Sequence, residues 1–179
     1  MPQLQGSRTE KNLISAFASE AQARDKYSIF ALKAREEGLL QIAEIFEKTA
    51  DNELAHARIW FELLHGQTAC TAENLRTAQN DESYEYNDLY AEFAKVAYEE
   101  GFDDIAKKFE MVALIEKSHE ERFKKLAENA EGGLVFSREG DTVWVCRNCG
   151  HIVIGKAAPE TCPVCSHAQS FFEIKAENY

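Results

Sequence analysis

Several features common in protein sequences are scarce or missing here. The 179 residues include three prolines, and none of them lies between residues 8 and 131. No run of about 18 apolar residues occurs, which excludes an ordinary transmembrane helix. The first residues, MPQLQGSRTEKN, have no basic segment followed by an apolar core. We therefore expect neither a secretory signal nor a membrane span, and a cytoplasmic protein.

Basic residues are also in the minority. The chain has 20 lysines and arginines against 31 aspartates and glutamates, and its formal net charge is −11. Nucleic acids are bound mainly through cationic side chains that neutralise phosphates. Anionic membrane surfaces attract the same side chains. The charge balance therefore predicts that neither nucleic acid nor a membrane is a partner.

Cysteine is rare until the C-terminal quarter of the chain. Only Cys70 precedes residue 146, and the other four cysteines lie within residues 134–179. In a reducing compartment, cysteine pairs indicate metal or redox chemistry before disulfides. The same segment holds two prolines and the β-forming runs TVWVC and SFFEI. The composition therefore predicts a helical domain over residues 1–133 and a small β-rich domain over residues 134–179.

The helical segment begins with a predicted hairpin of two long helices. Ser7 and Glu10 have capping-box spacing, which marks the start of the first helix. Small and apolar residues then recur every three to four positions, and Gly38 is a predicted helix stop. The second helix is expected from Leu39 to His65, followed by Gly66.

A second hairpin is predicted after a less periodic segment. Residues 66–80, GQTACTAENLRTAQN, are interpreted as a crossover with at most a short helix. The third helix is expected to start near Asn80 or Asp81 and to end at Gly101. The fourth is expected over residues 102–131, where two glycines follow it.

The two predicted hairpins repeat each other. Residues 36–56 (EEGLLQIAEIFEKTADNELAH) align without a gap with residues 99–119 (EEGFDDIAKKFEMVALIEKSH), 63 positions further on. Both segments open with Glu-Glu-Gly and end with Glu-x-x-His. The match extends upstream, where Tyr27 corresponds to Tyr90. Two similar hairpins joined by a long crossover are typical of a ferritin-like four-helix bundle, so the predicted fold is mainly α with a small β-rich C-terminal domain.

The repeat carries a set of metal-binding residue types. Each hairpin supplies a glutamate from its first helix and a Glu-x-x-His from its second, which is the ligand pattern of a di-iron carboxylate site in a helix bundle. Residues three apart share a helix face. Without a cation, so many carboxylates in one core would repel each other and several would take up protons. The candidate ligands are Glu20, Glu53 and His56 in the first hairpin, and Glu82, Glu85, Glu116 and His119 in the second.

Each part of this pattern also has an alternative explanation that involves no metal site. One Glu-x-x-His usually marks a solvated helix face, but two copies at matched positions with partner glutamates favour a metal pair. Tyr27 and Tyr90 could be plain core aromatics. Their matched positions lead us to expect that each hydroxyl reaches a ligand carboxylate.

The four C-terminal cysteines form a second candidate metal site. Cys146 and Cys149 form one Cys-x-x-Cys pair, and Cys162 and Cys165 form another, with twelve residues between the pairs. Four thiolates at this spacing make a tetrahedral site for zinc or iron. A one-electron carrier is the more useful partner for a di-iron centre, which favours iron.

Together these motifs resemble the rubrerythrin family over essentially the whole chain. The residues that carry the resemblance are GSRTEKN, Glu20, the Glu53-x-x-His56 and Glu116-x-x-His119 pairs, Glu82-x-x-Glu85, and CRNCG…CPVC. The resemblance implies an oxo- and carboxylate-bridged di-iron site and a rubredoxin-like domain with one iron on Cys146, Cys149, Cys162 and Cys165.

The resemblance also implies roles for the ligands. Glu53 and Glu116 would bridge the two irons, and Glu20 and Glu82 would be terminal ligands. His119 would stay bound throughout, whereas Glu85 and His56 would exchange on one iron with its redox state.

The implied activity is reduction of hydrogen peroxide to water. The four-cysteine iron would return electrons that come from NAD(P)H through a separate reductase or rubredoxin. No GxGxxG motif occurs, so the chain is not expected to bind the nucleotide itself. A head-to-tail homodimer is expected. Two alternatives remain: a ferroxidase or iron-storage protein, and a zinc-ribbon binding module without redox activity.

Overall fold

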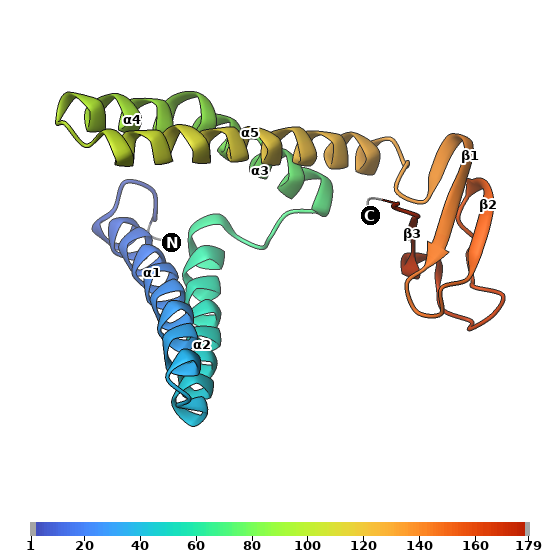
Figure 1. The fold of residues 1–179 in the computed structure, drawn as a ribbon, viewed down its shortest axis with the longest axis horizontal. Coiled ribbons are helices and arrows are strands. Elements are labelled where there is room, and N and C mark those ends of the chain that lie inside the picture. The colour runs from blue at the N-terminus through green and yellow to red at the C-terminus, as the bar shows by residue number, and fades with distance from the viewer. Residues whose placement is uncertain (1–2, 178–179) are drawn as a thin grey trace. The chain divides into compact units, whose positions relative to one another are not determined.

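The computed structural model describes residues 3–177 and combines long helices with one small sheet (Figure 1). It divides into two compact units between Thr68 and Ala69. The mainly α class with a β-rich C-terminal part is confirmed. The elements are α1 (Arg8–Glu36), α2 (Leu40–His65), α3 (Thr71–Tyr84), the π-helix η1 (Glu85–Leu89), α4 (Tyr90–Glu99), α5 (Asp103–Glu131), β1 (Ser137–Cys146), β2 (Ile152–Ala157), the 3₁₀ turn η2 (Gln169–Phe171) and β3 (Phe172–Ile174).

The first unit is an antiparallel hairpin of α1 and α2, which lie side by side (Figure 1). Ser7 caps α1, because its hydroxyl accepts a 3.0 Å hydrogen bond from the backbone N–H of Glu10. Gly38 has a φ of +74° at the turn, a conformation that disfavours residues with a Cβ. The predicted start and end of this hairpin are confirmed.

The second unit contains an equivalent hairpin, but its first helix starts earlier than predicted. α3 begins at Thr71 instead of near Asn80, so only residues 66–70 separate it from α2. The backbone at the start of α3 explains the difference. Cys70 and Glu73 form a capping box there, and the chain beyond is rich in good helix formers. The expectation that residues 66–80 hold at most a short helix is therefore wrong.

Alanines let the two helices of each hairpin pack closely. Ala31, Ala34, Ala43 and Ala50 are all at most 5% exposed in the first hairpin. Their counterparts 63 positions later, Ala94, Ala97, Ala106 and Ala113, are also buried. Small side chains at these positions bring the helix axes together and fix which side chains face each other.

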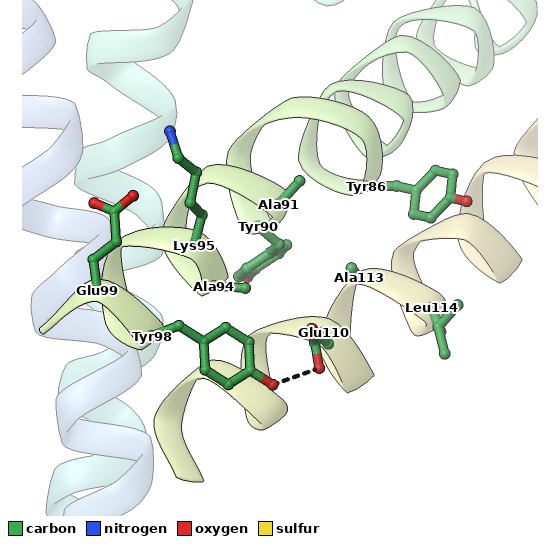
Figure 2. A pocket seen from close by; sticks show the side chains of 10 residues that line it. All are labelled: Tyr86, Tyr90, Ala91, Ala94, Lys95, Tyr98, Glu99, Glu110, Ala113 and Leu114. Atoms are coloured by element: carbon green, nitrogen blue, oxygen red, sulfur yellow. Dashed lines mark hydrogen bonds between the residues drawn. The ribbon is translucent and has the colours of Figure 1, made fainter. Parts of the chain in front are cut away.

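A polar contact joins the helices of each hairpin at matched positions. Arg35 donates to Glu47 at 2.7 Å between α1 and α2. In the second hairpin, Figure 2 shows Tyr98 of α4 reaching Glu110 of α5, with 3.2 Å between the hydroxyl and the carboxylate. Glu47 and Glu110 therefore have a structural role, which explains why they recur in the repeat.

The C-terminal sheet is antiparallel with the order β2-β1-β3. Its core consists of Trp144, Cys146, Ala158, Cys162 and Phe172, all at most 4% exposed. The indole N–H of Trp144 donates to the Gly155 carbonyl at 3.0 Å, so its one polar atom is satisfied. Among the described residues, no helix has the length and apolar character that crossing a bilayer requires.

The alanine packing generates a stability prediction. Ala43→Leu inserts three carbon atoms where the native side chain is 0% exposed, so we expect unfolding to be easier by about 1–3 kcal/mol. Urea unfolding followed by circular dichroism measures this. Ala18→Leu on the exposed side of α1 is the matched control and should change little. Equal effects of the two substitutions would contradict the packing account.

Candidate metal centres

The first hairpin brings Glu20, Glu53 and His56 together. Glu20 comes from α1, and the other two residues lie one turn apart on α2. The Nδ1 atom of His56 lies 3.0 Å from a Glu53 carboxylate oxygen and 3.7 Å from one of Glu20. One ligand atom from each of the three residues lies within 4.8 Å of the others. The hairpin thus forms a cluster of two carboxylates and one imidazole, which we name the first triad.

The second hairpin forms the equivalent cluster, the second triad, from Glu82, Glu116 and His119. Here the Nδ1 atom of His119 lies 2.7 Å from Glu116 and 3.5 Å from Glu82. In both triads the Nδ1 atom faces both carboxylates, so Nδ1 is the imidazole nitrogen placed to bind a metal ion. The structure thereby assembles six of the seven predicted helical ligands into two groups of the same composition.

The electrostatics of the second triad suit a cation. Burial raises the pKa of Glu82, and the hydrogen bond and charge of Glu116 raise it further, against the opposing effect of His119. The neighbouring carboxylate of Glu116 thus destabilises the ionised form of Glu82. A divalent ion removes that repulsion and accepts hard oxygen ligands together with imidazole, as iron does.

Glu85 is not a member of the second triad. It is half-buried and opens the π-helix, and its charge is among the causes that raise the pKa of Tyr90, after burial. Glu85 therefore lies near the cluster, and its role as a ligand stays a prediction.

Tyr27 and Tyr90, which were predicted to reach ligand carboxylates, pack in equivalent ways in the two hairpins. The Tyr27 ring lies 6.2 Å from that of Phe46, and the Tyr90 ring lies 5.9 Å from that of Phe109. Within residues 3–177 no hydrogen bond joins either hydroxyl to a ligand carboxylate. Their contact with the ligand carboxylates stays a prediction.

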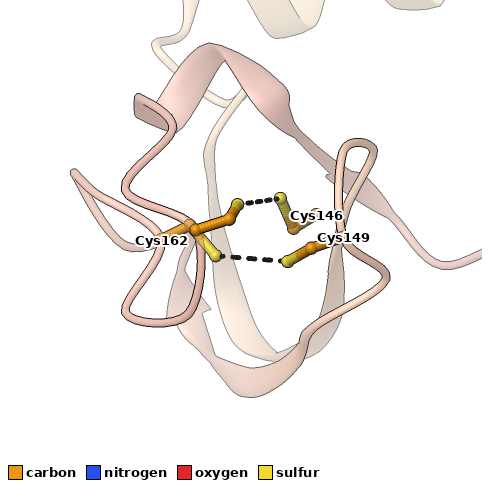
Figure 3. Close-up of side chains that lie close together, drawn as sticks. Cys146, Cys149 and Cys162 are labelled. Atoms are coloured by element: carbon orange, nitrogen blue, oxygen red, sulfur yellow. Dashed lines mark hydrogen bonds between the residues drawn. The ribbon is translucent and has the colours of Figure 1, made fainter.

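The four C-terminal cysteines converge from two loops of the small sheet, as Figure 3 shows for the three labelled side chains. The Cys146–Cys165 and Cys149–Cys162 sulfur pairs are each 3.7 Å apart. A disulfide needs about 2.05 Å, so these are not disulfides. A tetrahedron with metal–sulfur bonds of about 2.3 Å has edges of about 3.8 Å. The sulfur spacing therefore fits one tetrahedral metal ion.

Backbone N–H groups in the cysteine loops stabilise thiolates, which are the form of cysteine that binds a metal ion. The N–H of His167 lowers the pKa of Cys165 to about 5. The N–H of His151 acts on Cys149 in the same direction, but burial and the neighbouring thiols raise the pKa of Cys149 to about 12 overall. Cys165 therefore ionises readily, whereas Cys149 needs a cation to do so. Cys70 is exposed at the start of α3 and belongs to neither site.

The π-helix is the feature that the sequence prediction missed. A signal for it exists, because Glu20 and Glu82 are 62 positions apart whereas the other matched ligands and tyrosines are separated by 63. One extra residue therefore lies between Glu82 and Tyr90.

Comparison with known proteins agrees with this geometry. The rubrerythrin family model matches residues 11–127, and the model described as rubrerythrin, rubredoxin-like domain matches residues 144–173. A rubrerythrin from Porphyromonas gingivalis is 44% identical, over 98% of this chain and 94% of the relative. A rubrerythrin from Nitratidesulfovibrio vulgaris is 42% identical over 100% of both chains. Rubrerythrin-1 from Clostridium acetobutylicum is 40% identical, also over 100% of both.

The glutamate and histidine groups fit a di-iron site in a ferritin-like domain, and the four cysteines fit the iron site of a rubredoxin-like domain. The protein is therefore of the ferritin-like class with an appended rubredoxin-like domain. Within that class, the chain belongs to the rubrerythrin family.

The raised pKa of Glu82 predicts that Glu82→Gln has opposite effects on the unfolding midpoint of the metal-free and the metal-loaded protein. An acid whose folded pKa is raised costs stability when ionised, and this cost disappears as the pH falls below the unfolded pKa. In metal-free protein, Glu82→Gln should therefore raise the unfolding midpoint at pH 7 and change it little near pH 4. In metal-loaded protein it should lower the midpoint, because a ligand is lost.

Thermal unfolding of both forms at both pH values measures this effect. Glu92→Gln, at an exposed position of α4, is the control and should show no such reversal. If Glu82→Gln destabilised the metal-free protein at pH 7, the repulsion account would be wrong.

Proposed function

We propose that this protein is a peroxidase that reduces hydrogen peroxide to water at an iron pair held by its two triads. The observation that carries the proposal is the composition of the triads. Together they contain four glutamates and two histidines, arranged as one glutamate and one Glu-x-x-His per hairpin. This is the ligand set of di-iron carboxylate proteins.

The residues that would hold the iron follow from the two clusters. Following the likeness to rubrerythrins, Glu53 and Glu116 would bridge, and Glu20 and Glu82 would bind as terminal ligands. The bound iron pair would supply the two electrons that cleave the O–O bond, and with two protons the products are two water molecules.

The chain's own contribution is to hold the ligands in place before the reaction. Each histidine Nδ1 lies within 3.7 Å of both carboxylates of its triad. The buried alanines keep the ligand-bearing helices close, and the rings of Tyr27 and Tyr90 pack beside the ligand helices. Such prearrangement reduces the reorganisation that the reaction requires. Glu85 and His56 would be alternative ligands of one iron in its two redox states.

The small domain would return electrons to the iron pair. We assign the helical domain to residues 1–133 and the rubredoxin-like domain to residues 134–179. Iron on the four cysteines exchanges one electron at a time, and the core around Trp144 shields two of the sulfurs. The electrons would come from NAD(P)H through a separate reductase or a rubredoxin.

The donor iron would belong to a second copy of the chain in a head-to-tail homodimer. After His119, α5 continues for twelve residues to Glu131. At 1.5 Å per residue, this is roughly 18 Å of helix before the small domain begins. Electron transfer weakens steeply with distance, which favours the iron of a neighbouring chain.

The peroxidase assignment predicts the reactivity of the fully reduced protein. Hydrogen peroxide should oxidise it faster than air-saturated buffer does in stopped-flow mixing. Glu53→Gln should lower the peroxide rate by about 10–100-fold or more, because a bridging ligand is removed. Glu44→Gln, at an exposed position of the same helix outside the triad, should leave the rate nearly unchanged.

Equal rates with peroxide and air would overturn peroxide as the preferred oxidant. Formation of mineral-loaded particles after incubation with Fe²⁺ would favour the iron-storage alternative. A colourless native protein with zinc on its cysteines would favour the binding-module alternative.

The dimer assignment predicts complementation between two inactive variants. Glu116→Gln removes a ligand of the iron pair, and Cys149→Ser removes a ligand of the small-domain iron. Dimers reassembled from a mixture should recover part of the peroxide turnover with NAD(P)H and an added reductase, because each chain supplies the site that the other lacks. Turnover no higher than that of the separate variants would contradict electron transfer between chains.

A further inference from the structure

The connection between the two hairpins is short. α2 ends at His65 and α3 begins at Thr71, so residues 66–70 alone join them. An extended chain advances at most about 3.3–3.6 Å per residue, so the steps from His65 to Thr71 reach no further than roughly 22 Å. This length limits how far apart the end of α2 and the start of α3 can lie in one chain.

Contacts at both helix ends keep the connection from being lengthened by unwinding. Gly66 ends α2 with a φ of +81°. At the start of α3, Cys70 and Glu73 form a capping box. Arg76 then makes two hydrogen bonds, 2.8 and 2.6 Å long, to the carboxylate of Glu131 at the end of α5. Unwinding the first turns of α3 would break these contacts.

The iron pair sets the distance that the connection would have to span. Glu53 lies 12 residues before the end of α2, and Glu82 lies 11 residues after the start of α3. At 1.5 Å per residue, these two helix segments are roughly 18 and 17 Å long. A ferritin-like bundle has a long crossover because its second helix ends at one end of the bundle and its third begins at the other. With Glu53 and Glu82 at the same level around the iron pair, the two ends would lie roughly 35 Å apart.

The required distance exceeds the reach of residues 66–70. A segment that extends to roughly 22 Å does not close a gap of roughly 35 Å. A bundle in which α3 starts where α2 ends would need only a short turn, but that is not the ferritin-like arrangement of the family to which the chain belongs. The two hairpins of one ferritin-like bundle must therefore come from different chains.

Each hairpin also has an apolar surface at positions that the repeat preserves. Four large apolar residues of the first hairpin and their counterparts 63 positions later are all between 42% and 55% exposed. The pairs are Phe30 with Phe93, Leu39 with Phe102, Ile42 with Ile105, and Leu63 with Leu126. Removing such side chains from water is favourable. The first hairpin of one chain and the second hairpin of another thus offer each other apolar surfaces to cover.

We infer that the chain exchanges hairpins with a second copy, so that each iron pair is held by the first triad of one chain and the second triad of the other. This inference rests on the proposed iron pair and goes beyond it, because each site is incomplete without ligands from the partner. The dimer then contains two equivalent bundles, and residues 66–70 of each chain pass from one bundle to the other. A connection too short to close within one chain favours this kind of exchange.

Two heterodimers that carry the same four substitutions test the inference. In the split heterodimer, one chain carries Glu20→Gln and Glu53→Gln, and the other carries Glu82→Gln and Glu116→Gln. In the joint heterodimer, one chain carries all four substitutions and the other carries none. Different affinity tags on the two chains allow each heterodimer to be purified after co-expression. Because the substitutions are the same, the two heterodimers are matched controls for each other.

Anaerobic titration with ferrous iron counts the iron bound in excess of the cysteine sites. The split heterodimer should bind one iron pair, half as many as the unmodified dimer, because one of its bundles combines two intact triads. The joint heterodimer should bind no pair at the same concentration, since each bundle combines an intact with an altered triad. Loss of the ligands should weaken binding there by about 10–100-fold or more.

Lengthening the connection tests the cause of the exchange. An insertion of about 15 glycine and serine residues after Gly66 adds roughly 50 Å of reach, so the two hairpins of one chain can pair. At low protein concentration, the joint heterodimer with this insertion should regain an iron pair. The same insertion between Gly132 and Gly133, after α5, is the control and should restore none.

The possible failures are distinguishable. An iron pair in the joint heterodimer without an insertion, and none in the split heterodimer, would overturn the inference and locate both triads of each site in one chain. A monomeric unmodified protein that binds an iron pair would overturn it as well. If the unmodified protein binds iron only at its cysteines, the proposed iron pair itself fails, and the inference fails with it.

Discussion

The mutual repulsion of carboxylates that are held close together is the constraint on which this structure depends. Glu82 and Glu116 share one cluster, and Glu20 and Glu53 share another. Their proximity follows from the packing of the helices within each hairpin, α1 against α2 and α3 against α5. A cation relieves the repulsion between Glu82 and Glu116, so the packing that brings the carboxylates together also preorganises them to bind a metal ion. The spacing of the helices therefore determines the preference of the clusters for a metal ion.

The four-cysteine site also holds ionisable groups close together, but these groups are thiols. Its thiols lie 3.7 Å apart across two loops, and two of them are buried in the core of the small sheet. A backbone N–H favours the thiolate of Cys165, and a bound cation would favour that of Cys149. In such a small domain, the metal contributes to the fold as well as to the chemistry. The hard oxygen site and the soft sulfur site thus differ in ligand type, which suits them to different electronic roles.

The sequence predicted most members of the two triads because the repeat constrains them twice. Glu53 and His56 would be unremarkable in one copy, but Glu116 and His119 repeat the spacing at the matched position. The cysteine site was predictable from local spacing alone. The start of α3 was predicted wrongly, because capping by Cys70 and Glu73 is a weak signal beside the poor periodicity of that segment. The π-helix was missed although the offset between Glu20 and Glu82 is one position shorter than that of the other matched residues, because such an offset does not show where in the helix the extra residue is absorbed.

The central claim is that the glutamates and histidines of the two hairpins hold two iron ions as a pair. X-ray absorption at the iron edge tests it most directly, with a Cys146→Ser, Cys162→Ser protein used to remove the sulfur-bound iron. The account predicts oxygen and nitrogen neighbours together with an iron–iron distance of about 3.5–4 Å. Iron without a second iron at that range, or iron that is lost with the cysteines, would contradict it.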